Sequence, residues 1–479
     1  MKKSLTRNAA YNVIYRMLNV VFPLVSAAYI ARVLAPEGVG KTASIHNIMS
    51  YFLMFATLGI PQYGTREIAR RQDSQKEKNL LFTELLAANA ILTAVSAAAY
   101  YVLVRLICPA DAKIYYIFGL ELLFNFINID WFYQGEEEYA YITRRSILVK
   151  LLSLLALFLF VKDQEDCARY ALILCMGAGC NHFFNIFHAR KRISLVWRGL
   201  NLKRHLKPVL ILMTSGVVAS LYNKVDVTML GWLTTDAAVG FYTNAHKVIS
   251  LILGLVTAMS AVFFPRLSYA YQNNRSMYHQ YVSSGVKIVL LLAVPGCLGL
   301  ILVADLLSVV MFGGAFAPAA TTLRILAIFM IIKGVGDILC YQAVISSGNE
   351  KKLIKSRVYA GAANVILNMF LIPKFAHDGA AVAAVISELI VNGMLLRYAL
   401  TIVKPEINGK FYWSLILSSL MMGAAVLILR CFLESMVLEL MVSVAGGIAV
   451  FCLAMILLKN EIAEELWKKQ HRRFVWTKK

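Results

Sequence analysis

The chain has 479 residues, of which 59% are hydrophobic and 16% are charged, and its mean hydropathy is +0.66. A soluble domain carries about 25% charged residues, so this composition excludes an ordinary soluble protein and predicts a multi-pass membrane protein. The formal net charge of +21 does not indicate nucleic-acid binding. The cations lie in loops between apolar runs, where they predict cytoplasmic loops and contact with anionic membrane lipids.

Apolar runs long enough to cross a bilayer follow one another along the whole chain, broken by Pro, Gly and charged residues. Residues 1–10 are polar and basic and the next run is long enough to span, so we expect no cleavable signal peptide. The runs predict an all-α fold of about fourteen transmembrane helices with both termini on one side. These helices are expected at residues 9–33, 39–62, 80–107, 111–134, 142–161, 166–189, 208–233, 237–264, 281–304, 319–346, 355–374, 378–402, 411–433 and 437–458.

The distribution of Lys and Arg sets the expected orientation. The segment 190–207 contains seven cations and no acidic residue: Arg190, Lys191, Arg192, Arg198, Lys203, Arg204 and Lys207. Cationic loops are retained on the cytoplasmic side. The alternate loops are poor in cations and hold Lys41, Lys113, Lys162 and Lys374. We therefore expect a cytoplasmic (inner) membrane protein with both termini in the cytoplasm.

The same loop divides the chain into two blocks of similar design. Leu34–Gly40 (LAPEGVG) and Leu233–Gly240 (LTTDAAVG) occupy corresponding positions, and the spans that follow them end near Arg66 and Arg266. Such internal repeats are typical of transporters. We predict two pseudo-symmetric six-helix bundles and two additional helices. The expected division is an N-terminal bundle at 1–189, a basic linker at 190–207, a C-terminal bundle at 208–403, two helices at 404–458 and a basic cytoplasmic tail at 459–479.

Polar residues share one face of the first predicted helix. Asn12, Arg16 and Asn19 follow helical spacing, so their side chains must contact water, protein or a substrate. Asparagines of this kind also hydrogen-bond neighbouring helices. For Arg16 we favour a cavity, because charge inside a membrane is costly and usually functional.

The seventh and eighth predicted helices carry further charges. Lys224 and Asp226 are two residues apart and therefore cannot face each other on a helix. Each needs a partner on another helix or a polar cavity. Asn244 and Lys247 share a face of the next helix, and Lys247 is a candidate partner of Asp226.

The tenth and twelfth predicted helices contain the remaining candidate residues. Lys333 and Asp337 are spaced as an i,i+4 ion pair, for which structural and functional interpretations are equally open. Glu388 lies on a stripe with small residues, which favours a contact with a neighbouring helix.

Enzyme motifs are absent from the sequence. The eight cysteines include no CxxC pair, and there is no GxxxxGK[ST], GxSxG or HExxH. We expect a protein that is not an enzyme, with no catalytic residue, no metal and no cofactor.

Three stretches resemble one family, the bacterial polysaccharide repeat-unit flippases of the O-antigen and capsule type, within the multidrug/oligosaccharidyl-lipid/polysaccharide exporter superfamily. They are NIDWFYQGEEEYAYITRRS at 128–146, VDVTMLG at 225–231 with VGFYTNAHK and FPRLS after it, and NMFLIPKFAHDGAAVAAVISE at 368–388. The resemblance covers essentially the whole chain.

The resemblance implies two helical bundles around a central cavity and translocation of undecaprenyl-pyrophosphate-linked oligosaccharides by alternating access. Cations would bind the pyrophosphate and asparagines the sugars, which makes the substrate-binding candidates Arg16, Asn12, Asn19, Lys224, Asn244, Lys247 and Lys333. A proton or sodium gradient would drive transport, with Asp226, Glu388 and Asp337 as carriers of the ion. The expected partners are the lipid-linked oligosaccharide, membrane lipids and polysaccharide assembly proteins, without nucleic acid.

Three alternatives remain open. A drug/cation antiporter of the same fold would favour buried carboxylates, whereas this chain has more buried-cation candidates. A lipid II flippase is the second alternative. A membrane-embedded polysaccharide polymerase or ligase would be expected to have a long outer loop with catalytic Arg or His residues, and the predicted outer loops are short.

Overall fold

The computed structural model describes residues 5–107, 111–403 and 408–462, and within these ranges all regular secondary structure is helical. The side chains of residues 5–10, 12–21, 214–216, 218–219, 257–262 and 350 lie outside this description. The predicted all-α membrane class is confirmed: 8 helical segments of the described chain are long and apolar enough to cross a membrane. Several of these segments contain more than one predicted span.

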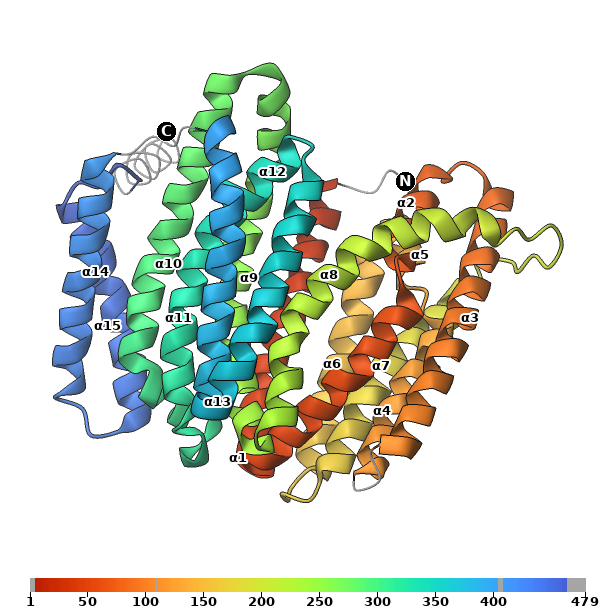
Figure 1. The fold of residues 1–479 in the computed structure, drawn as a ribbon, viewed down its shortest axis with the longest axis horizontal. Helices are drawn as coiled ribbons and strands as arrows, with labels where there is room; N and C mark the ends of the chain where they lie inside the picture. The colour runs from red at the N-terminus through yellow and green to blue at the C-terminus, as the bar shows by residue number, and fades with distance from the viewer. Residues whose placement is uncertain (1–4, 108–110, 404–407, 463–479) are drawn as a thin grey trace, which may run out of the picture. The chain divides into compact units, whose positions relative to one another are not determined.

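The internal contacts of the chain divide it into two compact units, residues 1–243 and 244–479. Figure 1 shows the helices of both units. The helices of the first unit are α1 (Leu5–Thr57), α2 (Ile60–Arg70), α3 (Gln75–Ile107), α4 (Ala112–Phe124), η1 (Asn125–Ile127), α5 (Asp130–Gly135), α6 (Tyr139–Phe160), α7 (Cys167–Ala189) and α8 (Lys203–Leu233). Helix α9 (Asp236–Asn273) begins in the first unit and continues into the second.

The second unit contains the rest of α9 and the C-terminal helices. These are α10 (Arg275–Phe312), η2 (Gly314–Phe316), α11 (Ala319–Gly336), the π-helical turn η3 (Asp337–Gln342), α12 (Ala343–Ser346), α13 (Glu350–Ile402), α14 (Gly409–Arg430) and α15 (Met436–Leu457). Helices α14 and α15 pack against each other and against α10 (Figure 1). They correspond to the two predicted additional helices. The predicted bundle boundaries themselves stay a prediction.

Two long helices each contain two predicted spans joined by a sharp bend. In α1 the bend is at Ala35 (φ 55°), and in α13 it is at Ala376 (φ 47°). Both φ angles lie in the left-handed region, which side chains with a Cβ rarely adopt. The predicted first and second spans therefore meet at Ala35, and the eleventh and twelfth meet at Ala376. When the two halves of each bent helix are counted separately, the number of long helices is close to the fourteen expected spans.

The fourth predicted span, 111–134, is not one continuous helix. It comprises α4, the 3-10 turn η1 and the short helix α5. Buried polar groups occupy the break: the Asn125 side chain donates to the Thr93 hydroxyl at 2.8 Å, and the Asn89 side chain donates to the Asn125 carbonyl at 2.5 Å. These hydrogen bonds to α3 satisfy polar groups at the point where the helix is interrupted.

Bulky aromatic side chains form the core beside this break. Trp131, Phe132 and Tyr133 of α5 are at most 2% exposed, and they pack with Ile68 of α2 and Leu85 of α3. The DWFYQG sequence thus fills the space at one end of the first unit. The packing of Trp131, Phe132 and Tyr133 fixes the position of the neighbouring Asp130.

The two repeated loops approach each other closely in the first unit. A Cβ atom added at Gly240 would lie 2.3 Å from the carbonyl oxygen of Pro36, and one added at Gly40 would overlap the backbone of Asp236. Only glycine fits at these two positions without a shift of the backbone. The repeats recognised in the sequence therefore meet at a glycine contact.

Candidate functional site

Lys224 on α8 is a candidate cation of the first unit whose side chain the structure describes. Its side chain is partly buried, its ammonium donates to the Ser50 hydroxyl at 2.5 Å, and it lies 5.8 Å from the centre of the Tyr51 ring. An ammonium has three N–H donors. The hydrogen bond to Ser50 uses one of them, so the site can bind an anion without breaking an ion pair.

A framework of neutral hydrogen bonds holds this part of α8 against α1. The Asn47 side chain donates to the Lys224 carbonyl at 3.2 Å and to the Thr228 hydroxyl at 2.8 Å, and the Tyr51 hydroxyl lies 2.8 Å from that of Thr228. The sequence analysis did not identify Asn47, Ser50 and Tyr51. Their spacing places them within an arc of about 100° on one helix face, which is the signal that could have found them.

Asp226 and Lys224 use different partners, as their spacing predicts. The Tyr242 hydroxyl of α9 donates to the Asp226 carboxylate at 2.9 Å, and Asp226 is 6% exposed. Lys247 donates to the Asn244 side-chain oxygen at 3.1 Å, which agrees with their shared helix face. Asn244 is fully buried, and its amide nitrogen has no hydrogen-bond partner among the described residues.

In the second unit, Lys333 of α11 pairs with Glu388 of α13. The ammonium lies 3.0 and 3.1 Å from the two carboxylate oxygens, and the Glu388 side chain is 3% exposed. The carboxylate that pairs with Lys333 is therefore on another helix and not one turn further along. Asp337 begins the π-helical turn and accepts from Gln342 at 3.4 Å. A π turn shifts the register of the following residues, which changes the faces expected from a regular α-helix.

Asn12, Arg16 and Asn19 lie on the helical backbone of α1, but their side chains are outside the described part of the structure. Their predicted roles stay predictions. Of the ten candidate residues, the structure describes the side chains of the other seven: Lys224, Asp226, Asn244, Lys247, Lys333, Asp337 and Glu388.

Asp130 of the DWFYQGEEE motif belongs to a polar cluster that joins three helices. Arg145 of α6 is 6% exposed, lies 3.0 Å from the Asp130 carboxylate and also donates to the Asn185 side chain. Asn185 of α7 in turn donates to Asp130 at 2.5 Å. Because these groups bind one another, the cluster holds α5, α6 and α7 together and is better suited to structure than to substrate binding.

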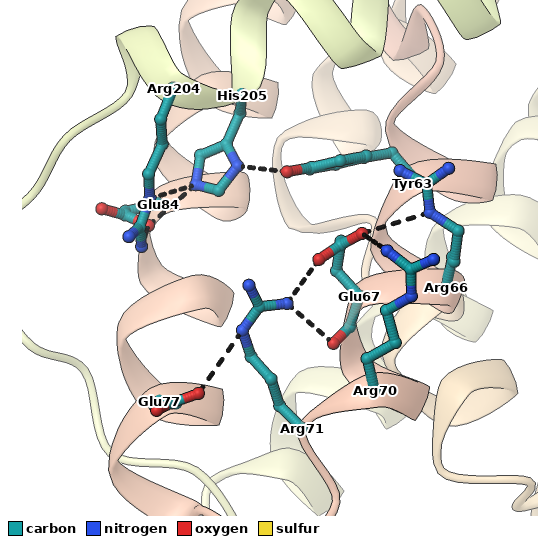
Figure 2. A network of polar contacts seen from close by, with 9 residues as sticks. All are labelled: Tyr63, Arg66, Glu67, Arg70, Arg71, Glu77, Glu84, Arg204 and His205. Atoms are coloured by element: carbon teal, nitrogen blue, oxygen red, sulfur yellow. Dashed lines mark hydrogen bonds and ion pairs between the residues drawn. The ribbon is translucent and has the colours of Figure 1, made fainter.

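A second polar network joins α2, α3 and the start of α8 (Figure 2). Glu67 accepts from Arg66, Arg70 and Arg71 at 3.1, 3.2 and 2.6 Å. Nearby, the fully buried Glu84 carboxylate lies 2.8 Å from the His205 imidazole and also binds Arg204. The other imidazole nitrogen of His205 is 2.8 Å from the Tyr63 hydroxyl. The basic segment after α7 is thereby attached to α3 and α2.

The chain is similar to known proteins over most of its length. A family model described as polysaccharide biosynthesis protein matches residues 5–271. A protein of Escherichia coli (strain K12) named "Putative O-antigen transporter" is 24% identical over 406 residues, which cover 83% of this chain and 97% of that protein. A "Probable low-salt glycan biosynthesis flippase Agl15" of Haloferax volcanii is 26% identical over 211 residues, 44% of each chain.

Solved structures show the same fold. The lipid II flippase MurJ in an inward closed conformation superposes with a TM-score of 0.77 at 15% identity, covering 95% of this chain and 100% of that one. An inward-facing multidrug resistance MATE family transporter of the MOP superfamily superposes with a TM-score of 0.62 at 16% identity, covering 81% of this chain and 97% of the other.

Proposed function

We propose that this chain, which belongs to the polysaccharide biosynthesis protein family, is a flippase that moves lipid-linked oligosaccharides across the cytoplasmic membrane. It is a multi-pass membrane protein, and its relatives are transporters and flippases, not enzymes. The names of these relatives and the likeness to the MurJ fold support the lipid-linked glycan as the class of substrate.

We further propose that the lipid carrier is undecaprenyl pyrophosphate. The observation that supports the pyrophosphate group is Lys224, a partly buried cation whose hydrogen bond to neutral Ser50 leaves other donors for an anion. The undecaprenyl chain is proposed from the family resemblance. Hydrogen bonds between an ammonium and a phosphate oxygen are charge-assisted and about twice as strong as neutral ones. Asn47, Tyr51 and Thr228 add amide and hydroxyl groups of the kind that bind sugars. Lys333 is a weaker candidate, because Glu388 already neutralises it.

Transport would proceed by alternating access and draw on an H⁺ or Na⁺ gradient, with Asp226, Asp337 and Glu388 as candidate carriers. Both termini would lie in the cytoplasm, and polysaccharide assembly proteins would deliver and receive the substrate. Imposing a pH gradient and a sodium gradient separately on loaded proteoliposomes distinguishes the two ions. Transport that responds to neither gradient would contradict the coupling proposal and leave the substrate proposal standing.

The test of the pyrophosphate site is transport of a fluorescent undecaprenyl-pyrophosphate oligosaccharide by native protein, Lys224→Gln and Lys224→Arg in proteoliposomes. A hydrogen bond to a charged group contributes about 1.5–3 kcal/mol, which corresponds to roughly a 10- to 100-fold loss for Lys224→Gln. Lys224→Arg should retain more activity. Arg169→Gln is the matched control, because Arg169 is 64% exposed and pairs with Asp166 of its own unit.

The outcome also separates the alternatives. Lys224→Gln protein that is stable and transports at the native rate would remove Lys224 from the substrate site. Lipid II moved in preference to the undecaprenyl-linked repeat unit would favour peptidoglycan synthesis. Extrusion of cationic dyes without movement of any lipid-linked glycan would favour the drug antiporter.

A further inference from the structure

The segment that joins α7 to α8, residues 190–202, is attached along α3 by hydrogen bonds to its backbone; we refer to it as the α7–α8 strap. Four polar side chains of α3 bind it: Gln75, Asn79 and Thr83 follow one another at intervals of one helical turn, and Glu84 is next to Thr83. The contacts are Gln75 to the Arg192 carbonyl (2.8 Å), Asn79 to the Ser194 N–H (3.4 Å), Thr83 to the Val196 N–H (3.1 Å) and Glu84 to the Asn201 N–H (2.7 Å). The strap therefore has a defined position on the surface of the first unit.

Two large apolar side chains of the strap are not covered. Trp197 is 77% exposed and Leu195 is 48% exposed, although the backbone on both sides of them is held by α3. A surface loop held in place by polar contacts has no need of an exposed tryptophan for its own stability. Tryptophan is enriched at the membrane–water interface, because its ring is apolar and its N–H is polar.

The strap and the first turns of α8 are strongly basic. Seven of the residues from 190 to 207 are Lys or Arg and none is acidic. Glu138 neutralises Arg192 at 2.8 Å, and Glu84 binds Arg204. The other five cations are Arg190, Lys191, Arg198, Lys203 and Lys207, all of them exposed.

Acidic groups on the neighbouring helices do not cancel this charge. Glu67 of α2 is surrounded by three arginines of its own region, and the exposed Glu77 of α3 lies 3.7 Å from Arg71 (Figure 2). The surface around Trp197 thus combines an exposed aromatic ring with excess positive charge. Clusters of four to eight cations beside a membrane span bind anionic lipid.

We propose that the α7–α8 strap is a binding site for anionic membrane phospholipid, with Trp197 and Leu195 inserted at the interface and Arg198 and Lys203 paired with lipid phosphates. The ligand is bilayer phospholipid and not the transported substrate, so the proposal does not rest on the proposed function. An acidic protein partner would match the charge. It would not account for the exposed apolar pair Trp197 and Leu195. The neighbouring helices α3 and α8 also carry exposed apolar side chains, such as Val95 and Ile211, that are suited to contact with lipid.

The structure supplies both the label position and its control. The parent protein is Cys431→Ser/Cys452→Ser, which lacks the exposed native cysteines of the described chain. Trp197→Cys in this parent is labelled with an environment-sensitive fluorophore. The parent, treated in the same way, gives the background signal. Trp232→Cys is the matched control: Trp232 is 73% exposed at the other end of α8, and no Lys or Arg occurs from 225 to 246.

The protein is reconstituted into vesicles of phosphatidylcholine, with or without phosphatidylglycerol, that contain a nitroxide-labelled lipid as quencher. We expect quenching at position 197 to rise at least about twofold with phosphatidylglycerol and to fall back in high salt. Arg198→Glu/Lys203→Glu should abolish the rise. Quenching at position 232 should be independent of lipid charge and unchanged by these substitutions, which also shows that the variant is folded.

A label at position 197 that remains in water in both lipid mixtures would overturn the proposal. Equal quenching in the two mixtures would overturn the proposed preference for anionic phospholipid and show only that Trp197 lies at the membrane interface. A label shielded only when a second protein is added would assign the strap to a protein partner.

Discussion

Glu84 provides the most specific test of the polar network that attaches the α7–α8 strap. Its carboxylate is fully buried on α3 and accepts from the His205 imidazole and the Arg204 guanidinium (Figure 2). It also accepts from the Asn201 N–H. Glu84→Ala removes all three acceptors at once. The His205 side chain is 4% exposed and would lose its acceptor inside the protein, whereas Arg204 is 45% exposed and can turn to water.

The expected loss follows from this difference. A buried donor left without an acceptor costs about 1–3 kcal/mol. With His205 as the main buried donor and Asn201 partly accessible, we expect Glu84→Ala to lower the free energy of unfolding by roughly 2–4 kcal/mol. Glu84→Gln should lose less, because its amide oxygen still accepts one hydrogen bond.

Thermal unfolding can be followed with a thiol-reactive dye in the Cys431→Ser/Cys452→Ser parent, since Cys167, Cys175 and Cys340 are buried and react only when the protein opens. The matched control is Glu77→Ala on the same helix, whose side chain is 65% exposed and whose ion pair is 3.7 Å long. An exposed pair of this kind contributes about 0–1 kcal/mol. If Glu84→Ala and Glu77→Ala unfold at the same temperature, the buried network does not stabilise the fold as argued.

Further substitutions test other parts of the structure. Gly240→Ala should lower the free energy of unfolding by about 1–3 kcal/mol, because its Cβ would overlap the Pro36 carbonyl. Gly393→Ala is the control: a Cβ there meets nothing within 4 Å, so this variant should be neutral or stabilising in the same thermal assay. Lys333→Met should cost about 3–5 kcal/mol, because it removes the ammonium that pairs with the buried Glu388 carboxylate. Lys333→Met/Glu388→Leu should recover much of that loss, and no recovery in the double variant would contradict the pairing. Ser50→Ala should leave transport within a few-fold of native, since the Lys224 charge remains, and a loss as large as that of Lys224→Gln would assign the role to the hydroxyl.

The sequence predicts the helical class and most helix positions because apolar length is a strong signal in a membrane protein. The breaks inside spans are less accessible. The interruption after Phe124 depends on hydrogen bonds between Asn125 and residues of α3, more than thirty residues away. The bends at Ala35 and Ala376 are different, because they fall between predicted spans, at 33/39 and 374/378. The sequence therefore places these two bends, although alanine itself does not indicate a positive φ.

The candidate site shows the same limit. Helix spacing correctly separates Lys224 from Asp226, and it places Lys247 beside Asn244. Spacing cannot identify partners on other helices, so the contacts of Lys224 with Ser50 and of Lys333 with Glu388 become visible only in three dimensions. The i,i+4 spacing of Lys333 and Asp337 was a weak guide, because the carboxylate that pairs with Lys333 is that of Glu388 on α13.

Movement of lipid-linked glycan by the purified native protein is the most direct test of the central claim. Proteoliposomes carry a fluorescent undecaprenyl-pyrophosphate oligosaccharide in both leaflets, and a membrane-impermeant reagent bleaches the outer one. The account predicts that the native protein makes the protected inner pool accessible, that protein-free vesicles do not, and that unlabelled substrate competes. An inner pool that stays protected with correctly folded protein, under either ion gradient, would contradict the flippase assignment.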